Sequence, residues 1–437
     1  MKALLFERNL PRFAASRLAS VLGSGKGVGV GPLRLLEVDA PALPGPDWHR
    51  VTPVLSGICG SDLATLDVRS SRYFEELVSF PFVPGHEVVG TLDDDAVAAD
   101  GTLLPAGSRV VLEPVLGCVA RHIDPPCPAC AAGHTGDCEL VAFGHLRPGL
   151  QTGFCADTGG GWSAAGLVAH GSQLHPVADG LTDADAVTIE PVACAVHAAL
   201  GAGVRDGDTV AVLGAGTLGL TVVAALTHLV ATGRMPVPAT VLVGARYPHQ
   251  RQLALALGAT EALPPDQLAR AVRRRSRSLA VGAPTVGGQR LTGGADVVLD
   301  CVGSSASVAQ ALDMVRPRGR IALVGMPGKV SVDLTSLWHR EVSLAGAYAY
   351  GVEDVAGHPA AAGRAGKASK AAEPVRTFAL AAEVVAAKGT GRLVSARYPL
   401  ERFEEAVAHA GAAGRRGAVK VAFELPAPRT SRKGTAQ

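Results

Sequence analysis

Residues 209–226 decide the fold, and they read TVAVLGAGTLGLTVVAAL without a single charged side chain. An apolar run is followed by a GxGxxG turn and then by a segment of helical length. In such a turn the first glycine permits the tight bend, the second lets a pyrophosphate approach the backbone, and the third allows close helix–strand packing. The stretch therefore predicts a dinucleotide-binding strand, turn and helix. The predicted cofactor contacts in it are Gly214, Gly216, Thr217, Leu218 and Gly219.

A sheet with helices on both faces is predicted around this turn. Short apolar runs alternate with helical segments, giving strands at 209–213, 239–244, 295–301, 320–325 and 342–347, and helices at 218–230, 249–257 and 305–315. This alternation is typical of βαβ units, so an α/β fold with a doubly wound parallel sheet follows. Strands buried on both faces are apolar throughout, which explains residues 209–226 better than a membrane span does. We expect no membrane partner.

The rest of the chain predicts a second, β-rich domain. Before about residue 200, turn signals such as Pro44-Gly45-Pro46 separate short strands. Near the other end, helices at 378–387 and 403–410 precede a last strand at 419–423. Three segments, at 13–31, 268–294 and 355–373, are rich in Gly, Ala, Ser or Arg, and they are expected to be insertions outside the core.

The second strand of the parallel sheet ends in Val243-Gly244-Ala245-Arg246, without the acidic residue that binds the adenosine ribose of NAD. A carboxylate would repel a 2′-phosphate by roughly 4 kcal/mol at about 4 Å and an effective dielectric constant of about 20, whereas an arginine pairs with it. We expect NADP(H) in preference to NAD(H), the alternative being that Arg246 is an ordinary loop residue. The remaining predicted cofactor contacts lie at strand ends: Gly244, Ala245, Cys301, Val324 and Gly325.

Four cysteines predict a structural zinc site. Cys118, Cys127, Cys130 and Cys138 are separated by eight, two and seven residues in a stretch rich in turn signals. Four thiolates close a tetrahedral zinc shell and leave no position for a substrate. Disulfide bonds are the alternative, and His122, Asp124 or His134 is an alternative to one of the cysteines.

A second, dispersed set of donors predicts a catalytic zinc site. The residues are Cys59 beside Ser61 and Asp62, His86 beside Glu87, and Glu190 at the junction of the two domains. Each of these motifs alone is weak evidence for a metal site, and His86 by itself is more typical of a hydrogen-bonded core histidine. Together, Cys59, His86, Glu87 and Glu190 supply the nitrogen, oxygen and sulfur ligands of an open zinc site.

The overall composition excludes several classes of protein. The chain has 437 residues, and its 41 Lys and Arg against 39 Asp and Glu give a formal net charge of +2. Such a balance gives no general reason to expect nucleic acid as a partner, and the arginine run at 273–277 is interpreted as a solvated helix face. Eight cysteines are too few for a disulfide-rich secreted scaffold, and MKALLFER at 1–8 is too short for a signal peptide. We expect a cytoplasmic protein.

These motifs resemble one known family, the zinc-dependent medium-chain dehydrogenase/reductases, which include alcohol, polyol and threonine dehydrogenases. The similarity runs over nearly the whole chain. Its segments are MKALL at 1–5, GICGSD at 57–62, PGHEVVG at 84–90, the four cysteines, Glu190-Pro191, the glycine turn and GAT at 258–260.

The resemblance implies a GroES-like catalytic domain at 1–190 and 348–437, with a structural zinc lobe at about 113–140, and a Rossmann NAD(P)-binding domain at 191–347. It also implies a homodimer or homotetramer built on the Rossmann sheets. Cys59, His86 and Glu87 fall on the catalytic zinc ligands or their close neighbours. Glu190 falls where polyol and threonine dehydrogenases have glutamate and alcohol dehydrogenases have cysteine.

Three departures from the family pattern affect how the family's residue roles apply to this chain. Ser61 holds the proton-relay hydroxyl position, but Ala64 stands where a relay histidine often follows. Cys118 lies farther upstream than usual, so either Cys118 or Asp124 is the fourth ligand of the lobe. The three insertions have no family counterpart. Cys155, Cys194 and Cys301 remain as ordinary buried thiols, with Cys301 also expected near the cofactor.

The predicted function is hydride transfer between NADP(H) and an alcohol or polyol, or the matching aldehyde or ketone, with two zinc ions per chain. Zinc activates the oxygen, and Ser61 passes its proton onward. Two alternatives share the fold: a zinc-free enone or quinone reductase, and a protein that binds NADPH without turnover. A zinc-ribbon nucleic-acid-binding protein is a third, but it leaves the glycine turn unexplained.

Overall fold

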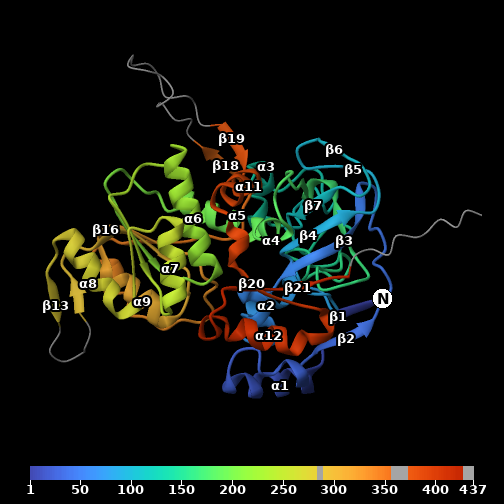
Figure 1. Cartoon of the computed structure of the whole chain (residues 1–437), viewed down its shortest axis with the longest axis horizontal. Coiled ribbons are helices and arrows are strands. Elements are labelled where there is room, and N and C mark those ends of the chain that lie inside the picture. The colour runs from blue at the N-terminus through green and yellow to red at the C-terminus, as the bar shows by residue number, and fades with distance from the viewer. Residues whose placement is uncertain (283–288, 356–372, 427–437) are drawn as a thin grey trace, which may run out of the picture.

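The structure is a computed structural model that describes residues 1–282, 289–355 and 373–426, and its two large sheets lie toward opposite ends of the long axis (Figure 1). One sheet is parallel, and it contains the glycine turn. The other is mostly antiparallel, and it combines strands from the first half of the chain with two strands near the end.

The parallel sheet has six strands in the order β12-β11-β10-β15-β16-β17. They are β10 (Thr209–Leu213), β11 (Thr240–Gly244), β12 (Glu261–Leu263), β15 (Ala295–Asp300), β16 (Val315–Leu323) and β17 (Ser343–Gly346). The crossover helices are α6 (Thr217–Ala231), α7 (Pro248–Leu257), α8 (Pro265–Ser276) and α9 (Ser305–Met314), and the short α10 (Thr335–His339) precedes β17. The predicted doubly wound sheet is confirmed, although the strand expected at 320–325 begins earlier, at Val315.

Both faces of the central strands of this sheet are buried, which is why β10 and β11 are apolar at successive positions. In β10, Val210 and Val212 pack toward α5 (Ile189–Gly201), α6 and α11 (Thr377–Lys388). Ala211 and Leu213 alternate with them and pack toward α8 and α9. The uncharged stretch 209–226 therefore consists of a central strand and a packed helix. Among the described residues, no helix combines the length and the apolar character that crossing a bilayer requires.

The second sheet brings the two halves of the chain together. Its order is β20-β21-β3-β4-β7-β9, with β8 also paired to β3. The strands are β3 (Trp48–Gly57), β4 (Val88–Leu92), β7 (Arg109–Leu112), β8 (Leu167–His170), β9 (Leu174–Pro176), β20 (Val394–Tyr398) and β21 (Lys420–Glu424). Ala422 of β21 lies opposite Gly57 of β3 in an antiparallel register. The end of β3, where the motif Gly57–Asp62 begins, is therefore held by the C-terminal strand.

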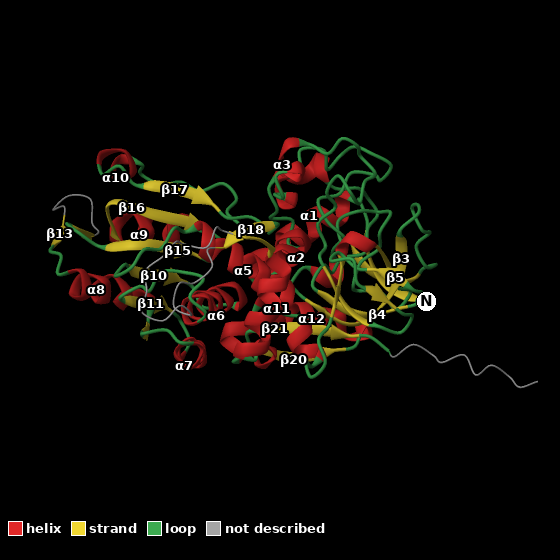
Figure 2. Cartoon of the chain, turned by 90° about the horizontal axis from the view of Figure 1, so that it is seen from above, coloured by secondary structure: helices red, strands yellow, loops and turns green. Residues whose placement is uncertain are grey.

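Helices fill the space between the sheets and cover the outer layer. Figure 2 shows α5, α6 and α11 between the two sheets, and α5 packs on both of the others. The remaining helices are α1 (Leu10–Ala19), α2 (Gly60–Leu66), α3 (Pro128–Ala131), α4 (Asp183–Ala186) and α12 (Phe403–Gly411). Four two-stranded antiparallel sheets complete the described strands: β1 (Lys2–Phe6) with β2 (Leu33–Glu37), β5 (Ala96–Val97) with β6 (Leu103–Leu104), β13 (Ala280–Gly282) with β14 (Gln289–Leu291), and β18 (Val352–Val355) with β19 (Glu373–Arg376).

Two of the three segments expected to be insertions outside the core contribute to it, so that prediction was wrong for them. In 13–31, Val28 joins a buried cluster, and the buried Ser16 hydroxyl donates to the carbonyl of Leu66 at 2.6 Å. In 268–294, Leu268 and Val272 of α8 are fully buried against the parallel sheet. Their spacing of four residues puts both on one face of the helix, and the arginine run that follows them hid this stripe.

The arginines of α8 occupy its other face, as expected for a solvated surface. Arg274 forms a partly exposed ion pair with Glu261 at 3.3 Å, and Arg275 pairs with the same carboxylate. Of the third segment, residues 356–372 lie outside the described residues.

Candidate metal and cofactor sites

Three residues of the predicted catalytic set form a tight cluster. Single ligand atoms of Cys59, His86 and Glu87 all lie within 4.8 Å of one another. Cys59 is the N-cap of α2, directly after β3, while His86 and Glu87 precede β4 in the same sheet. Because β3 and β4 are adjacent antiparallel strands, Cys59 meets His86 and Glu87, which are 27 and 28 positions away in the sequence, at one end of the sheet.

Asp62 positions two members of this cluster. Its Oδ2 accepts the backbone N–H of Cys59 at 2.8 Å, and its Oδ1 lies 3.5 Å from Nδ1 of His86. A carboxylate behind a metal-ligating histidine fixes the ring and its tautomer and leaves the other nitrogen as the ligand atom. This geometry leaves Nε2 of His86 available to a metal.

Glu190 lies beside the cluster rather than inside it. From the first turn of α5, its Oε1 accepts the phenol O–H of Tyr350 at 3.1 Å. Cys194, one helical turn later, lies 3.8 Å from the same oxygen. Cys194 therefore contacts Glu190, a neighbour that the sequence analysis did not predict for this thiol.

Lys420 is the second residue that the sequence analysis missed. This lysine of β21 is 2 % exposed and forms an ion pair with Glu87, which is also buried. A single lysine inside the apolar run VKVAF was the available signal, since a lysine is almost never fully buried without a partner. Tyr350 gave no comparable signal because it follows no recognisable motif.

The cluster contains more buried carboxylates than cations. Burial raises the pKa of Asp62, and it raises the pKa of Glu190 to about 7 although His86 acts in the opposite direction. Burial alone would lower the pKa of His86, but Asp62 and Cys59 raise it to about 10. The shifts of Asp62 and Glu190 come first from burial, which disfavours the charged carboxylate, whereas that of His86 comes from its negatively charged neighbours.

The hydrogen bonding of these residues also fits a metal ion. Among the described residues, Oε1 of Glu87 is buried without a hydrogen-bond partner. Buried polar atoms rarely remain unsatisfied, and this carboxylate lies beside the thiol of Cys59. A divalent cation that accepts sulfur, nitrogen and oxygen ligands suits this set, and zinc is such an ion.

Ser61 lies at the start of α2, two residues after Cys59, and is partly buried. Its backbone carbonyl accepts the hydroxyl of Thr65 at 3.0 Å. Ala64, one turn along the helix, has no group that could take a proton from it.

The four lobe cysteines form a second cluster, with their sulfur atoms within 4.8 Å of one another. Sγ of Cys138 lies 3.7 Å from that of Cys118 and 4.0 Å from that of Cys127. Tetrahedral zinc–sulfur bonds of about 2.3 Å place sulfur atoms about 3.8 Å apart. The cysteines form no disulfide bond, and Asp124 is exposed and outside the cluster.

Backbone N–H groups point at the lobe sulfurs as they do around thiolates. The N–H of Cys127 donates to Sγ of Cys118 at 3.3 Å, and that of Cys130 donates to Sγ of Cys127 at 3.4 Å. Burial raises the pKa of Cys127, but the N–H groups of Cys130 and Glu139 lower it to about 7. The lobe therefore holds a preformed four-sulfur site.

The glycine turn has the geometry that a pyrophosphate site requires. Gly214 has φ +89°, and Gly216 is the N-cap of α6 with open space where its side chain would be. At Gly219 a Cβ would overlap the carbonyl of Gly214. Thr217 and Leu218 begin the helix, so their N–H groups lie at its N-terminus.

The other predicted cofactor residues meet this turn at the ends of the parallel strands. Gly214 N–H donates to the carbonyl of Gly244 at 3.0 Å, and the N–H of Cys301 donates to the carbonyl of Leu213 at 3.0 Å. Gly325 approaches the backbone of residues 301–302 so closely that a Cβ would clash. Val324 precedes it, Ala245 is buried, and Arg246 is exposed and lines a pocket. Burial raises the pKa of Cys301, so it is a neutral thiol.

Two family models match the chain. Residues 45–179 match the alcohol dehydrogenase GroES-like domain, and residues 235–360 match the zinc-binding dehydrogenase domain. Sorbitol dehydrogenase of Arabidopsis thaliana is 30% identical over 328 residues, which is 74% of this chain and 79% of that protein. L-idonate 5-dehydrogenase of Vitis vinifera is 29% identical over 327 residues, 74% of this chain and 79% of that protein.

Solved structures show the same fold at lower identity. Galactitol-1-phosphate dehydrogenase from Escherichia coli superposes with a TM-score of 0.66 at 20% identity and covers 98% of this chain and 100% of that chain. A zinc-binding dehydrogenase from Sinorhizobium meliloti 1021, bound to NADP, has a TM-score of 0.63 at 23% identity and covers 92% and 98%.

Proposed function

The chain belongs to the zinc-dependent medium-chain dehydrogenases, and from this premise we propose that it transfers hydride between NADP(H) and a polyol or related alcohol. The observation that carries the proposal is the buried group of Cys59, His86 and Glu87, whose ligand atoms lie within 4.8 Å of one another. A nicotinamide cofactor supplies the hydride chemistry, so the protein orients the reactants and adjusts charge.

The residues of the cluster would hold the catalytic zinc through Cys59, His86 and Glu87 or Glu190. When bound, zinc polarises the substrate oxygen, as it lowers the pKa of a bound water from about 15.7 to about 7. Asp62 holds the ring of His86 and the backbone of Cys59 in place. Lys420 balances the charge of the buried carboxylate of Glu87.

Ser61 is proposed to take the proton that leaves the substrate hydroxyl. It follows Cys59 by two residues at the start of α2, and its partial exposure gives it access to solvent. With Ala64 in place of a second relay group, we propose that the proton passes from Ser61 to water.

A polyol is the favoured substrate class for two reasons. Sorbitol and L-idonate dehydrogenases are relatives at 29–30% identity. Glu190, rather than a cysteine, stands beside the metal cluster, and Tyr350 holds its carboxylate there. Glutamate at this position is the family feature of polyol and threonine dehydrogenases.

The preference for NADP(H) is supported by the end of β11. No acidic residue follows Gly244, and Arg246 is exposed there with its side chain at a pocket. A guanidinium group binds a phosphate through two parallel hydrogen bonds.

A metal count combined with an activity screen tests this function. We expect about two zinc ions per purified chain by mass spectrometry, and NADPH oxidation with ketoses or other polyhydroxy ketones. Cys59→Ser should lower the count to about one and abolish turnover. Cys155→Ser removes a buried thiol away from both clusters and should change neither. Full NADPH turnover and full zinc occupancy in Cys59→Ser would contradict the mechanism, and one zinc or none in the wild type would favour a reductase without catalytic zinc.

A further inference from the structure

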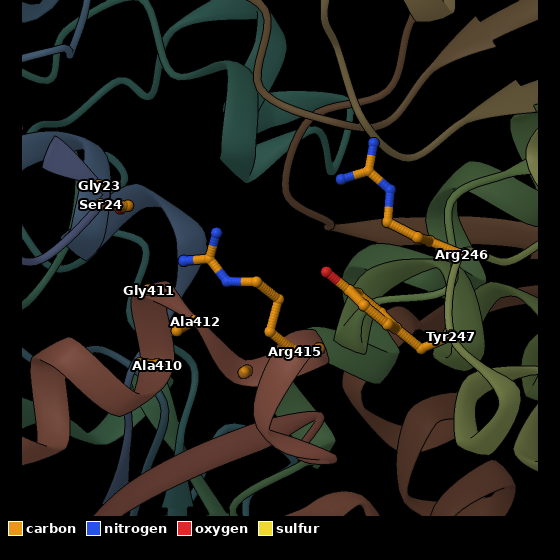
Figure 3. A pocket seen from close by; sticks show the side chains of 10 residues that line it. Gly23, Ser24, Arg246, Tyr247, Ala410, Gly411, Ala412 and Arg415 are labelled. Atoms are coloured by element: carbon orange, nitrogen blue, oxygen red, sulfur yellow. The ribbon is translucent and has the colours of Figure 1, made fainter. Parts of the chain in front are cut away.

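A pocket lies between the parallel sheet and the C-terminal helices, beside the end of β11. The pocket has a volume of about 320 Å³, at the lower end of the range for ligand sites. Its size therefore suits one end of a nucleotide better than a whole nucleotide. Figure 3 shows Arg246 and Tyr247 reaching into it from one side and Arg415 from the other. The three side chains come from segments about 170 residues apart in the sequence.

The two arginines give this pocket a strong positive charge. Among the described residues, no Asp or Glu lines it, so no carboxylate of that part of the chain neutralises either guanidinium there. Elsewhere in the same region arginines are paired, since Arg69 lies 2.6 Å from Asp67 and Arg402 contacts Glu405 over two hydrogen bonds. Two unneutralised guanidinium groups that converge on one pocket are suited to a dianion.

The wall of the pocket is built by close backbone packing. At Gly414 a Cβ would overlap the ring of Tyr247, so only glycine allows the C-terminal segment this near to β11. At Gly411 a Cβ would overlap the carbonyl of Ser24. These contacts fix where Arg415, in the turn Ala413–Arg416, stands relative to Arg246.

The N-terminal segment 13–31 forms the remaining side. The hydroxyl of Ser24 donates to Oδ2 of Asp67 at 2.6 Å, and the N–H of Gly25 donates to Oδ1 at 2.8 Å. Asp67 is almost fully buried, so this loop is held in place. Because the hydroxyl proton of Ser24 is already donated to Asp67, Ser24 forms part of the pocket wall and does not bind the ligand.

We propose that Arg415 and Arg246 together bind the 2′-phosphate of NADP(H), so that the catalytic domain contributes half of the site that selects this cofactor. The proposal rests on the NADP(H) preference proposed above and extends it to a residue of the other domain. The chemistry recognised is a phosphate monoester dianion, on the nucleotide or free in solution. The phenol of Tyr247 stands between the two arginines and supplies a further hydrogen bond (Figure 3).

Adenine nucleotides without the nicotinamide test this site independently of turnover. Calorimetry would measure the dissociation constants of 2′,5′-ADP, 5′-AMP and inorganic phosphate for the zinc-loaded wild type, Arg246→Ala, Arg415→Ala and Arg416→Ala. Arg416 is the matched control because it does not line the pocket and its charge acts on Glu405. We expect Arg415→Ala to weaken the binding of 2′,5′-ADP about tenfold, as loss of a charged hydrogen bond does. The dissociation constant of 5′-AMP should change less than twofold. Arg416→Ala should change neither.

The outcomes separate this proposal from the one on which it rests. If Arg246→Ala weakens 2′,5′-ADP and Arg415→Ala does not, the NADP(H) preference stands and the role of Arg415 is wrong. If the wild type binds 2′,5′-ADP no tighter than 5′-AMP, the preference itself is wrong. If Arg415→Ala weakens inorganic phosphate and leaves 2′,5′-ADP unchanged, the pocket is a free-phosphate site and the proposal is overturned. Equal weakening of 2′,5′-ADP and 5′-AMP would also overturn it.

Discussion

Two glycines of the turn between β10 and α6 are required for different reasons. Gly216 has open space where a Cβ would be and a negative φ that any residue adopts. Gly219 has the carbonyl of Gly214 in that position. The first glycine therefore leaves room for a ligand, whereas the second lets the helix lie against its own strand.

This difference predicts opposite results for two similar variants. Gly216→Ala should fold with an unchanged melting temperature and bind NADPH at least tenfold more weakly, because the methyl group occupies the pyrophosphate position. Gly219→Ala should lose stability, by about 1–3 kcal/mol as overpacking usually does. Thermal melts without cofactor and NADPH fluorescence titrations measure the two effects. Equal melting temperatures for both variants would refute the distinction.

The ion pair of Lys420 and Glu87 is the other single contact on which the site depends. Both side chains are buried, with side-chain exposures of 2 % and 1 %. Lys420→Met would leave the carboxylate without its partner, and breaking a buried pair costs about 3–5 kcal/mol. We expect a large fall in the urea midpoint for Lys420→Met and a smaller one for Lys420→Arg, which keeps the charge. A midpoint for Lys420→Met within error of the wild type would show that Glu87 does not need this cation.

At the scale of helices and strands, the sequence predicts best where apolar periodicity is undisturbed. The strand at 209–213 and the helix at 403–410 have the expected places, with α12 ending one residue later. In α8, by contrast, arginines are as frequent as Leu, Ala and Val together, although Leu268, Ala271 and Val272 suffice to bury one face. Composition averages over both faces of a helix, so it misjudges a narrow apolar stripe.

One contact between elements makes a pH-dependent contribution to stability. Nδ1 of His197, in α5, lies 2.7 Å from Oε1 of Glu353, in β18. The hydrogen bond to Glu353 raises the pKa of His197 although burial opposes it. A histidine whose pKa is higher in the folded state stabilises the protein fully below about pH 6.5, the unfolded value. This stabilisation disappears as the pH rises through the folded value.

His197→Gln should therefore have a lower melting temperature than the wild type at pH 6, by an amount that shrinks toward pH 9. The expected loss at pH 6 is about 1 kcal/mol, the usual worth of a partly buried hydrogen bond. Thermal melts at one-unit steps of pH measure it. His339→Gln, at an exposed histidine in α10, is the control and should follow the wild type. A difference that is constant across the range would show that His197 does not titrate with folding.

At the scale of the whole molecule, the sequence indicates which residues carry chemistry but not how the chain brings them together. Cys59, His86 and Glu87 lie at the ends of neighbouring strands, and the sequence motifs around them indicate their role. Lys420 reaches the same site only because β21 pairs with β3 across more than 360 residues of sequence. Arg415 comes to lie at the pocket beside Arg246 from the turn Ala413–Arg416, again far along the chain. The partners of such residues follow from no local pattern, since they depend on contacts between distant segments.

The free edge of the parallel sheet leads to a last prediction, about assembly. β17 is the outer strand, all four of its residues are exposed, and the described strands pair with it on one side only. Large apolar side chains gather in and around it, including Trp338 at 78% and Leu344 at 36% exposure. Exposed strand edges with apolar neighbours pair with other chains, so we propose that two copies join here into a homodimer.

Trp338→Glu combined with Leu344→Glu should convert this dimer into a monomer, because each copy would place two carboxylates in a dry interface. Light scattering after size-exclusion chromatography should give about twice the chain mass, 44.4 kDa, for the wild type and the single mass for the double variant. Leu103→Glu, at an exposed leucine of the hairpin β5–β6, controls for the added charge and should remain dimeric. A wild type that is monomeric at all concentrations, or a double variant with unchanged mass, would place the interface elsewhere. Because β15 and β16 separate this edge from β10, where the glycine turn lies, the monomeric variant should still bind NADPH with the wild-type dissociation constant.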